Sequence, residues 1–108
     1  MQVYALKTCD TCRRAIAEIR AAGHEPKITD VRADGISAAD RARFLEAFGD
    51  ALVNRSSATW RGLSEEERAR DPADLLADHP TLMKRPVIEA DGKLYLGWKP
   101  DVRQAVLG

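Results

Sequence analysis

Residues 2–12 of the chain read QVYALKTCDTC, and this stretch decides the fold. The alternation of side chains over residues 2–6 predicts a short strand that runs into a loop. Residues 10–22 then predict a helix, because apolar side chains recur at helical spacing and Gly23 follows directly. Residues 25–31 predict a second strand. A strand, a helix and a second strand form a right-handed βαβ unit when the two strands are parallel neighbours.

The middle of the chain is more polar and predicts three further helices. Ser37 caps the first of them, which Gly49 ends. Ser64 begins a second with a capping box, and Pro72 begins a third. The apolar side chains predicted for the inner faces of the first and third helices are Phe44, Leu45, Phe48, Leu75, Leu76 and Leu82.

The last quarter of the chain predicts a hairpin and a helix. Residues 86–90 predict a strand, Asp91 and Gly92 form a two-residue turn, and residues 93–97 return antiparallel. Pro100 stands where a last helix begins. The order β-α-β, a helical insert, then β-β-α predicts an α/β fold with a mixed four-stranded sheet and helices packed on it.

Length and charge exclude several classes of protein. The 108 residues are enough for a hydrophobic core and predict one domain, residues 1–108, while 17 basic and 17 acidic side chains cancel. This balance gives no long-range attraction to nucleic acid or to an acidic membrane. No apolar stretch has the ~18 residues of a membrane span, and the N-terminus does not resemble a signal peptide, so we expect a cytoplasmic protein. Thiols are kept reduced there, so the two cysteines are expected to do chemistry.

Cys9 and Cys12 form a Cys-x-x-Cys motif where the first strand ends and the first helix begins. A thiolate there lies at the positive end of the helix dipole, near free backbone N–H groups. Lowering a thiol pKa from ~8.5 to ~7 requires about 2 kcal/mol, and a helix terminus typically supplies about 0.3–1 kcal/mol, so a cation must help. Two other interpretations stay open: half of a zinc site, and inert core cysteines.

Two further groups of polar residues are candidates for the site. Arg85 and Pro86 precede a predicted buried strand. A proline there holds a tight turn, sometimes in the cis form, and the guanidinium of Arg85 suits oxyanions and favours a nearby thiolate. A solvated arginine at a strand entrance is the simpler alternative. Asn54 and Arg55 interrupt an apolar segment, and they either line an anion site or simply end a helix.

The sequence resembles the ArsC/Spx family, in particular its short YffB-like branch, and the resemblance covers essentially the whole chain. Its motifs are the segments at residues 4–13, 52–55, 59–61, 79–87 and 97–100. The resemblance implies a thioredoxin-like fold with a helical insert and a catalytic Cys9. It also implies that Arg85, ahead of a cis Pro86, contacts the oxyanion or thiol substrate. Glutathione is the implied co-substrate, glutaredoxin a further partner, and no cofactor is tightly bound.

Two positions depart from the arsenate reductases of that family. Asn54 stands where an arginine is expected, with Arg55 one residue on, and Lys99 replaces a second arginine. A lysine keeps the charge but loses the bidentate geometry of a guanidinium. The chain is therefore interpreted as a glutathione-coupled thiol reductase, with Cys9, Cys12 and Arg85 as catalytic residues. The substrate-binding residues expected beside them are Asn54, Arg55, Pro86 and Lys99.

The alternative is a redox-sensing regulator like the Spx branch, which binds the RNA polymerase alpha subunit and uses a Cys-x-x-Cys pair as a switch. This chain has that pair in Cys9 and Cys12. It is shorter than typical regulators of this kind and has no distinctive motif for a polymerase contact. We therefore favour the reductase.

Overall fold

Four short strands form one mixed sheet in the order β2-β1-β3-β4. They are β1 (Gln2–Ala5), β2 (Lys27–Asp30), β3 (Val87–Ala90) and β4 (Lys93–Leu96). β1 pairs with β2 in parallel and with β3 antiparallel, and β3 pairs with β4 antiparallel. The predicted parallel β-α-β opening and the mixed four-stranded α/β fold are thus confirmed.

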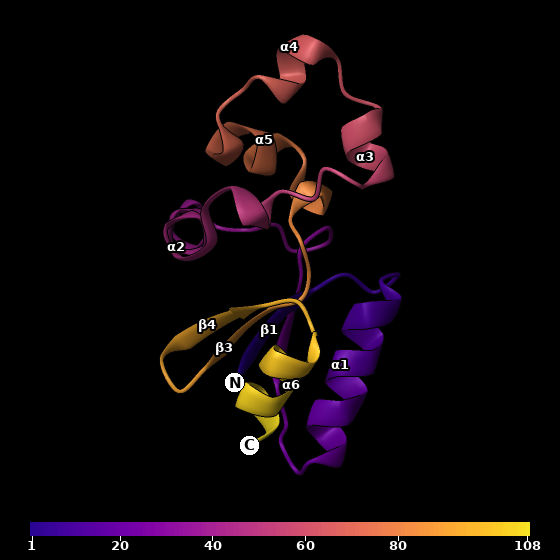
Figure 1. Ribbon diagram of the computed structural model, residues 1–108, viewed down its shortest axis with the longest axis vertical. Coiled ribbons are helices and arrows are strands. Elements are labelled where there is room, and N and C mark those ends of the chain that lie inside the picture. The colour runs from indigo at the N-terminus through magenta and orange to yellow at the C-terminus, as the bar shows by residue number, and fades with distance from the viewer. The chain divides into compact units, whose positions relative to one another are not determined.

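Helices α1 (Asp10–Ala21) and α6 (Pro100–Leu107) pack on the same face of this sheet (Figure 1). The reason is the alternation of the strands, which directs alternate side chains of β1 and β3 to one face. The buried side chains of this cluster are Val3, Ala5, Cys12, Ala15, Ile19, Ile88, Trp98 and Val106. One of the two cysteines is therefore part of the core that holds the sheet and its helices together.

The computed structural model describes all residues, 1–108, and its contacts divide the chain into two compact units. The first, here called the sheet unit, comprises Met1–Asp34 and Arg85–Gly108. The second, the helical unit, comprises Gly35–Lys84. No helix in either unit combines the length and the apolar composition that a membrane crossing needs.

The helical unit consists of short helices joined by tight turns. In chain order they are α2 (Ala38–Phe48), η1 (Gly49–Leu52), α3 (Ala58–Arg61), α4 (Glu65–Arg68), α5 (Pro72–Asp78) and η2 (Pro80–Leu82). α2 packs against α5, and the buried side chains of the unit include Phe44, Leu52, Leu75, Leu76 and Leu82. Ser37, Ser64 and Pro72 begin helices as predicted.

Two features of the helical unit differ from the prediction. Residues 58–61 form α3, which the sequence pattern did not indicate because four residues are too few for a helical period. Leu82 does not continue the inner face of α5. It lies in η2, because Pro80 follows His79 and begins a separate turn.

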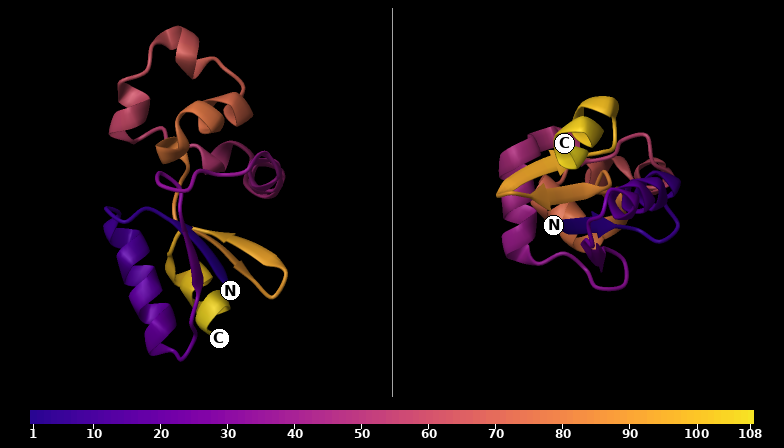
Figure 2. Two further views of the ribbon diagram at one scale, coloured as in Figure 1. Left: turned by 180° about the vertical axis from the view of Figure 1, so that it is seen from behind. Right: turned by 90° about the horizontal axis from the view of Figure 1, so that it is seen from below.

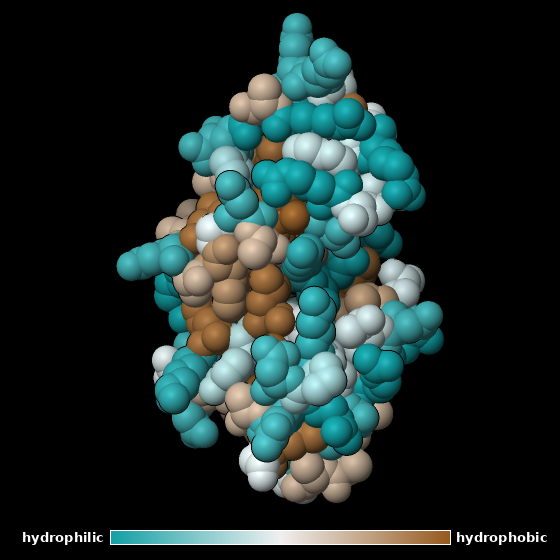
Figure 3. Space-filling model, viewed as in Figure 1, coloured by the Kyte–Doolittle hydropathy of each residue, from teal (hydrophilic) through white to brown (hydrophobic).

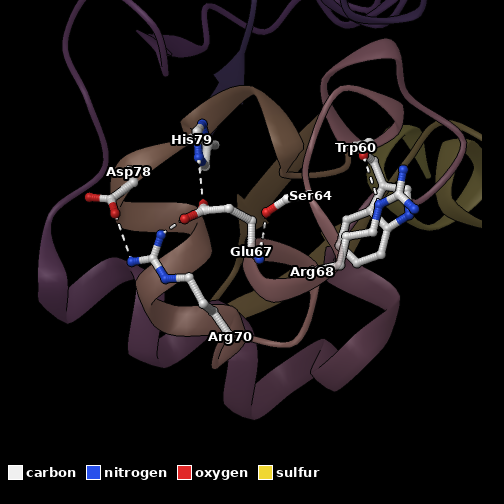
Figure 4. Close-up of polar contacts among 7 residues, drawn as sticks. All are labelled: Trp60, Ser64, Glu67, Arg68, Arg70, Asp78 and His79. Carbon is white, nitrogen blue, oxygen red and sulfur yellow. Dashed lines mark hydrogen bonds and ion pairs between the residues drawn. The ribbon is translucent and has the colours of Figure 1, made fainter.

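Charged side chains hold the helical unit together at its surface. Figure 3 shows hydrophilic residues gathered over α3 and α4. Figure 4 shows Arg70 between two carboxylates, with nitrogen–oxygen distances of 3.0 Å to Glu67 and 2.7 Å to Asp78. Arg68 donates to the carbonyl of Trp60 and its guanidinium also lies 5.7 Å from the centre of that indole ring. These contacts link α3, α4 and α5.

Candidate active site

Cys9 occupies the N-cap of α1. The chain leaves β1 at Ala5, and the backbone N–H of Cys9 donates to the carbonyl of Leu6 over 3.0 Å. Its own carbonyl accepts from the N–H of Arg13, which closes the first helical turn. The side chain is half-buried and unpaired with any other cysteine. The position therefore combines solvent access with the unbonded N–H groups of a helix start.

Cys12 lies in the first turn of α1 and faces the opposite environment. Only 1% of its surface is exposed, and it belongs to the apolar cluster that includes Trp98 and Val106. Residues 12, 15 and 19 follow the helical period, so all three turn toward the sheet. Cys12 is consequently reachable from Cys9 but shielded from a substrate in solution.

The environment of Cys9 favours its thiolate. Burial by itself raises the pKa of Cys9, but this effect is outweighed. Hydrogen bonds from the backbone and the thiol of Cys12, and the charge and hydrogen bond of Arg85, together lower the pKa of Cys9 below its ordinary value. The cation that the helix terminus requires is therefore at hand.

The environment of Cys12 favours its thiol. Burial is the main cause that raises the pKa of Cys12 to about 12, and the neighbouring Cys9 sulfur raises it further. A hydrogen bond from the backbone of Leu6 and the charge of Arg85 act in the opposite direction without offsetting the burial. Of the two thiols, Cys9 therefore loses its proton first as the pH rises, and Cys12 keeps its own.

Arg85 and Pro86 stand immediately before β3, which starts at Val87. The peptide bond between them is cis, Pro86 is buried and Arg85 is half-buried. Gly97 has a φ of 83°, a conformation that favours glycine, and its N–H donates to the Pro86 carbonyl over 2.8 Å. The segment that carries Arg85 is thereby tied to the turn that leads into α6.

The structure brings Cys9, Cys12 and Arg85 together, and the predicted Pro86 adjoins Arg85 through the cis peptide bond. Lys99 is exposed at the N-cap of α6. Asn54 is in the helical unit, where its side chain accepts from the N–H of Ser56 in a local turn. Arg55 follows it and lies 3.9 Å from Asp50, with its guanidinium over the ring of Trp60.

A half-buried thiolate beside a guanidinium suits nucleophilic attack on an electrophilic sulfur or on an oxyanion held by the same cation. No three or more His, Cys, Asp or Glu side chains form a group that could hold a metal ion. The residues present offer thiol chemistry.

The sequence of this chain matches the ArsC family over residues 4–106. The chain belongs to the ArsC family. An uncharacterized protein of Haemophilus influenzae is 37% identical over 108 residues, 95% of each chain.

Two solved structures show how the ArsC fold is shared. The YffB protein is 29% identical, with a TM-score of 0.91 over 99% of this chain and 98% of that chain. An arsenate reductase (ArsC) related protein from Brucella melitensis is 34% identical, with a TM-score of 0.74 over 96% and 91% of the two chains. The fold of this ArsC family chain is thus the thioredoxin-like fold that the sequence predicted.

The sequence analysis singled out neither Trp98 nor Glu18. Trp98 is 5% exposed and packs against the cluster that contains Cys12, while its indole N–H donates to the Glu18 carboxylate. Arg103 donates to the same carboxylate over 3.1 Å. The hydrogen bond from Trp98 is the main cause that lowers the pKa of Glu18. No local sequence pattern joins residues 18, 98 and 103. The hydrogen bonds that hold Trp98 in the cluster beside Cys12 are therefore visible only in the folded structure.

Proposed function

We propose that this chain is an arsenate reductase-like thiol reductase in which the Cys9 thiolate is the nucleophile. One observation carries the proposal: the Cys9 pKa is lowered and the Cys12 pKa is raised within one helical turn, beside Arg85. Membership of the ArsC family and similarity to an arsenate reductase related protein support the reaction class. Neighbouring titratable groups whose pKa values are pushed apart are the usual mark of divided chemical roles.

The proposed first step is attack on a disulfide. The Cys9 thiolate forms a bond to one substrate sulfur, the substrate disulfide breaks, and the other sulfur leaves as a thiolate. Arg85 stays close to both sulfurs, so its charge is well placed to stabilise the negative charge as it moves.

The second step releases the remaining half of the substrate. Cys12 gives up its proton and attacks the sulfur of Cys9, so that a Cys9–Cys12 disulfide forms and the substrate thiolate leaves. The substrate gains two electrons, one proton from Cys12 and one from solvent. Two molecules of glutathione, the proposed co-substrate, reduce the protein disulfide and leave as glutathione disulfide. Glutaredoxin is the proposed protein partner for the same step.

The test is reduction of the mixed disulfide of glutathione and 2-mercaptoethanol, coupled to glutathione reductase and NADPH. We expect Cys9→Ser to reduce turnover to the background rate, because a serine hydroxyl is not ionised near neutral pH. If Cys12→Ser retains turnover, glutathione performs the second step in place of Cys12. Full activity in a folded Cys9→Ser variant would refute the proposal.

Arg85 is tested by the pH dependence of Cys9 alkylation. Arg85→Ala removes the positive charge and should raise the midpoint pH, whereas Arg85→Lys keeps the charge and should hold it. Loss of substrate affinity in Arg85→Lys would show that the planar fork also binds the substrate. Arg32→Ala, at an exposed position in the loop after β2, is the matched control for loss of one positive charge. An unchanged midpoint in folded Arg85→Ala would remove Arg85 from the site.

The same dithiol supports a second candidate, a redox-sensing regulator that binds the RNA polymerase alpha subunit. The observation in its favour is the Cys9–Cys12 pair itself, because both functions need a reversible disulfide. Pull-down with the alpha subunit, using reduced and oxidised protein, separates the two. Redox-dependent capture without turnover in the coupled assay would favour the regulator.

A further inference from the structure

Helix α1 carries a second stripe of side chains beside the one that enters the core. Arg13, Ile16, Ala17 and Arg20 recur at positions i, i+3, i+4 and i+7, so they share one side of the helix. This stripe adjoins the core stripe of residues 12, 15 and 19, with Ile16 packed against the core cluster, and it borders a groove beside β2. Figure 2 shows α1 running beside β2 when the molecule is seen from behind.

The groove has a volume of about 610 Å³ and lies wholly within the sheet unit. Such a volume is typical of sites for small molecules, which span roughly 300–1,000 Å³. Its apolar lining comes from Ala5, Leu6, Ile16, Ala17, Ile28 and Ala33.

Ile28 supplies exposed apolar surface to the groove. It pairs with the buried Val3 across the parallel ladder, so both side chains point to the face that α1 covers. Val3 is fully buried, whereas Ile28, on the edge strand β2, keeps 39% of its surface exposed. A ligand over Ile28 removes apolar surface from water, which favours binding by about 25 cal/mol per Å².

The acidic side chains at the groove are already committed to the loop after β2. The Asp30 carboxylate accepts from the N–H groups of Arg32 and Ala33, both over 2.9 Å, and from that of Lys7 over 3.3 Å. Asp34 accepts from the N–H of Asp30 over 3.1 Å. These bonds shape the loop and leave the two carboxylates less able to bind a cation.

The basic side chains at the groove are held far more loosely. Arg13 lies 3.2 Å from Asp10, and the side chains are 64% and 97% exposed. Arg20 lies 3.5 Å from Glu25, in a pair that is exposed as well. Exposed pairs of this kind contribute little, typically about 0.2–1 kcal/mol, so either arginine can turn to an incoming anion.

We propose that the groove between α1 and β2 binds a small amphiphilic anion. Its apolar body lies over Ile16 and Ile28, and its carboxylate or sulfonate pairs with Arg13 at the rim, where Arg20 adds a second positive charge. Lys7 adds a third positive charge. This site is distinct from the thiol pair and does not depend on the proposed reductase activity.

The test compares two fluorescent probes that differ in charge. 8-Anilinonaphthalene-1-sulfonate carries a sulfonate on an apolar body, and N-phenyl-1-naphthylamine is its neutral counterpart. We expect saturable binding of the sulfonate to the folded chain with one site, and at least about three-fold weaker binding of the neutral probe. Decanoate should displace the sulfonate, and decanol should not.

Variants locate the site on the helix. Arg13→Gln should weaken sulfonate binding at least about three-fold and leave the neutral probe unchanged. Arg14→Gln is the matched control, because it removes the same charge from the next residue, which does not line the groove. Ala17→Phe should fill the groove and block both probes, whereas Ala105→Phe on exposed α6 surface should not.

Two measurements check that the variants are folded and that the probe binds in the groove. Thermal unfolding shows that each variant is folded, since the sulfonate probe also binds partly unfolded chains. Methyl NMR signals of Ile16 and Ile28 should shift on titration of the unmodified chain. Equal effects of Arg13→Gln and Arg14→Gln, or unmoved Ile16 and Ile28 signals at saturation, would overturn the proposal.

Discussion

Helices of the helical unit and of the sheet unit begin with different atoms at the N-cap. In the helical unit, Ser37, Ser57 and Ser64 each stand at an N-cap and accept a hydrogen bond from the backbone N–H three residues on. In the sheet unit, Cys9 stands at the N-cap of α1, and the backbone of Cys12, again three residues on, favours its thiolate. Replacing oxygen by sulfur at this position turns a structural cap into an ionisable nucleophile.

The surroundings of the N-cap residue decide whether its side chain also becomes a reactive nucleophile. Of the serine caps, Ser37 and Ser64 are exposed and Ser57 is half-buried. Cys9 has Arg85 and the thiol of Cys12 beside it, and it packs at the edge of the apolar cluster. A helix start alone therefore makes a cap, whereas a helix start with a cation and a buried proton donor makes a reactive thiol.

The largest expected effect is the difference in reactivity between the two cysteines. With a pKa of about 12, Cys12 is ionised to on the order of 1 part in 10⁵ at pH 7, whereas the lowered pKa of Cys9 gives it far more thiolate. Iodoacetamide should therefore label Cys9 of the folded, reduced protein, and Cys12 should react only after unfolding. Mass spectrometry of peptides from a time course measures both rates, and preferential labelling of Cys12 would reverse the assignment.

The sequence predicts much of this site because the residues that begin a helix are local. Cys9 after a strand, Gly23 after a helix and Pro72 at a helix start each act within a few residues, so composition and spacing locate them. The contact between Trp98 and Glu18 joins residues 80 positions apart and leaves no local pattern. The pairing of Arg85 with Cys9 likewise needs the sheet, and only the family resemblance indicated it in advance.

The next effect is on the free energy of unfolding, which should fall when the side-chain oxygen is removed from Ser37 but not when Cys9 is replaced by serine. Ser37→Ala removes the oxygen that accepts from Asp40 N–H at 3.1 Å and should lower the free energy of unfolding by about 1 kcal/mol. Cys9→Ser supplies a better neutral acceptor and should not destabilise the protein at low pH, where Cys9 is protonated. Urea unfolding of both variants measures the difference, and a loss of about 1 kcal/mol in Cys9→Ser at low pH would show that the neutral Cys9 thiol itself stabilises the fold.

The same pair of caps gives a pH dependence with a defined sign. The Cys9 pKa is lowered in the folded state, so its thiolate stabilises the fold above the ordinary thiol pKa of ~8.5. That contribution is lost as the pH falls from ~8.5 through the folded pKa. Wild-type protein should therefore gain stability relative to Cys9→Ser as the pH rises through this window. A constant difference between the two proteins would show that the thiolate is not stabilised.

A cysteine placed at a serine cap isolates the contribution of the helix start. In Ser37→Cys the new thiol has the N-terminus of α2 but neither Arg85 nor a thiol partner, so only the helix acts on it. The helix contribution of about 0.3–1 kcal/mol corresponds to a pKa about 0.2–0.7 below that of a free thiol. Alkylation rates against pH, measured in a Cys9→Ser background, give the value. A midpoint as low as that of Cys9 would mean that Arg85 and Cys12 contribute nothing.

The smallest effect tests the exposed charges that hold the helical unit together (Figure 4). A hydrogen bond from Arg70 is the main cause that lowers the pKa of the Asp78 carboxyl. A lowered carboxyl pKa stabilises the fold above its ordinary value of ~3.9, and the contribution disappears as the pH falls through the folded pKa. Asp78→Asn should therefore lower the melting temperature slightly at pH 7 and have no effect once the pH is below the folded pKa of Asp78.

The control for Asp78→Asn is Glu46→Gln, which removes one exposed negative charge from α2. It separates the specific pair with Arg70 from a change in net charge, because only Asp78 lies 2.7 Å from that guanidinium. Added salt should shrink the effect of Asp78→Asn, since both side chains reach solvent and their attraction is screened. A melting temperature that falls equally in both variants, or an effect of Asp78→Asn that persists below the folded pKa of Asp78, would show that the Arg70 pair does not hold α5 to the turn after α4.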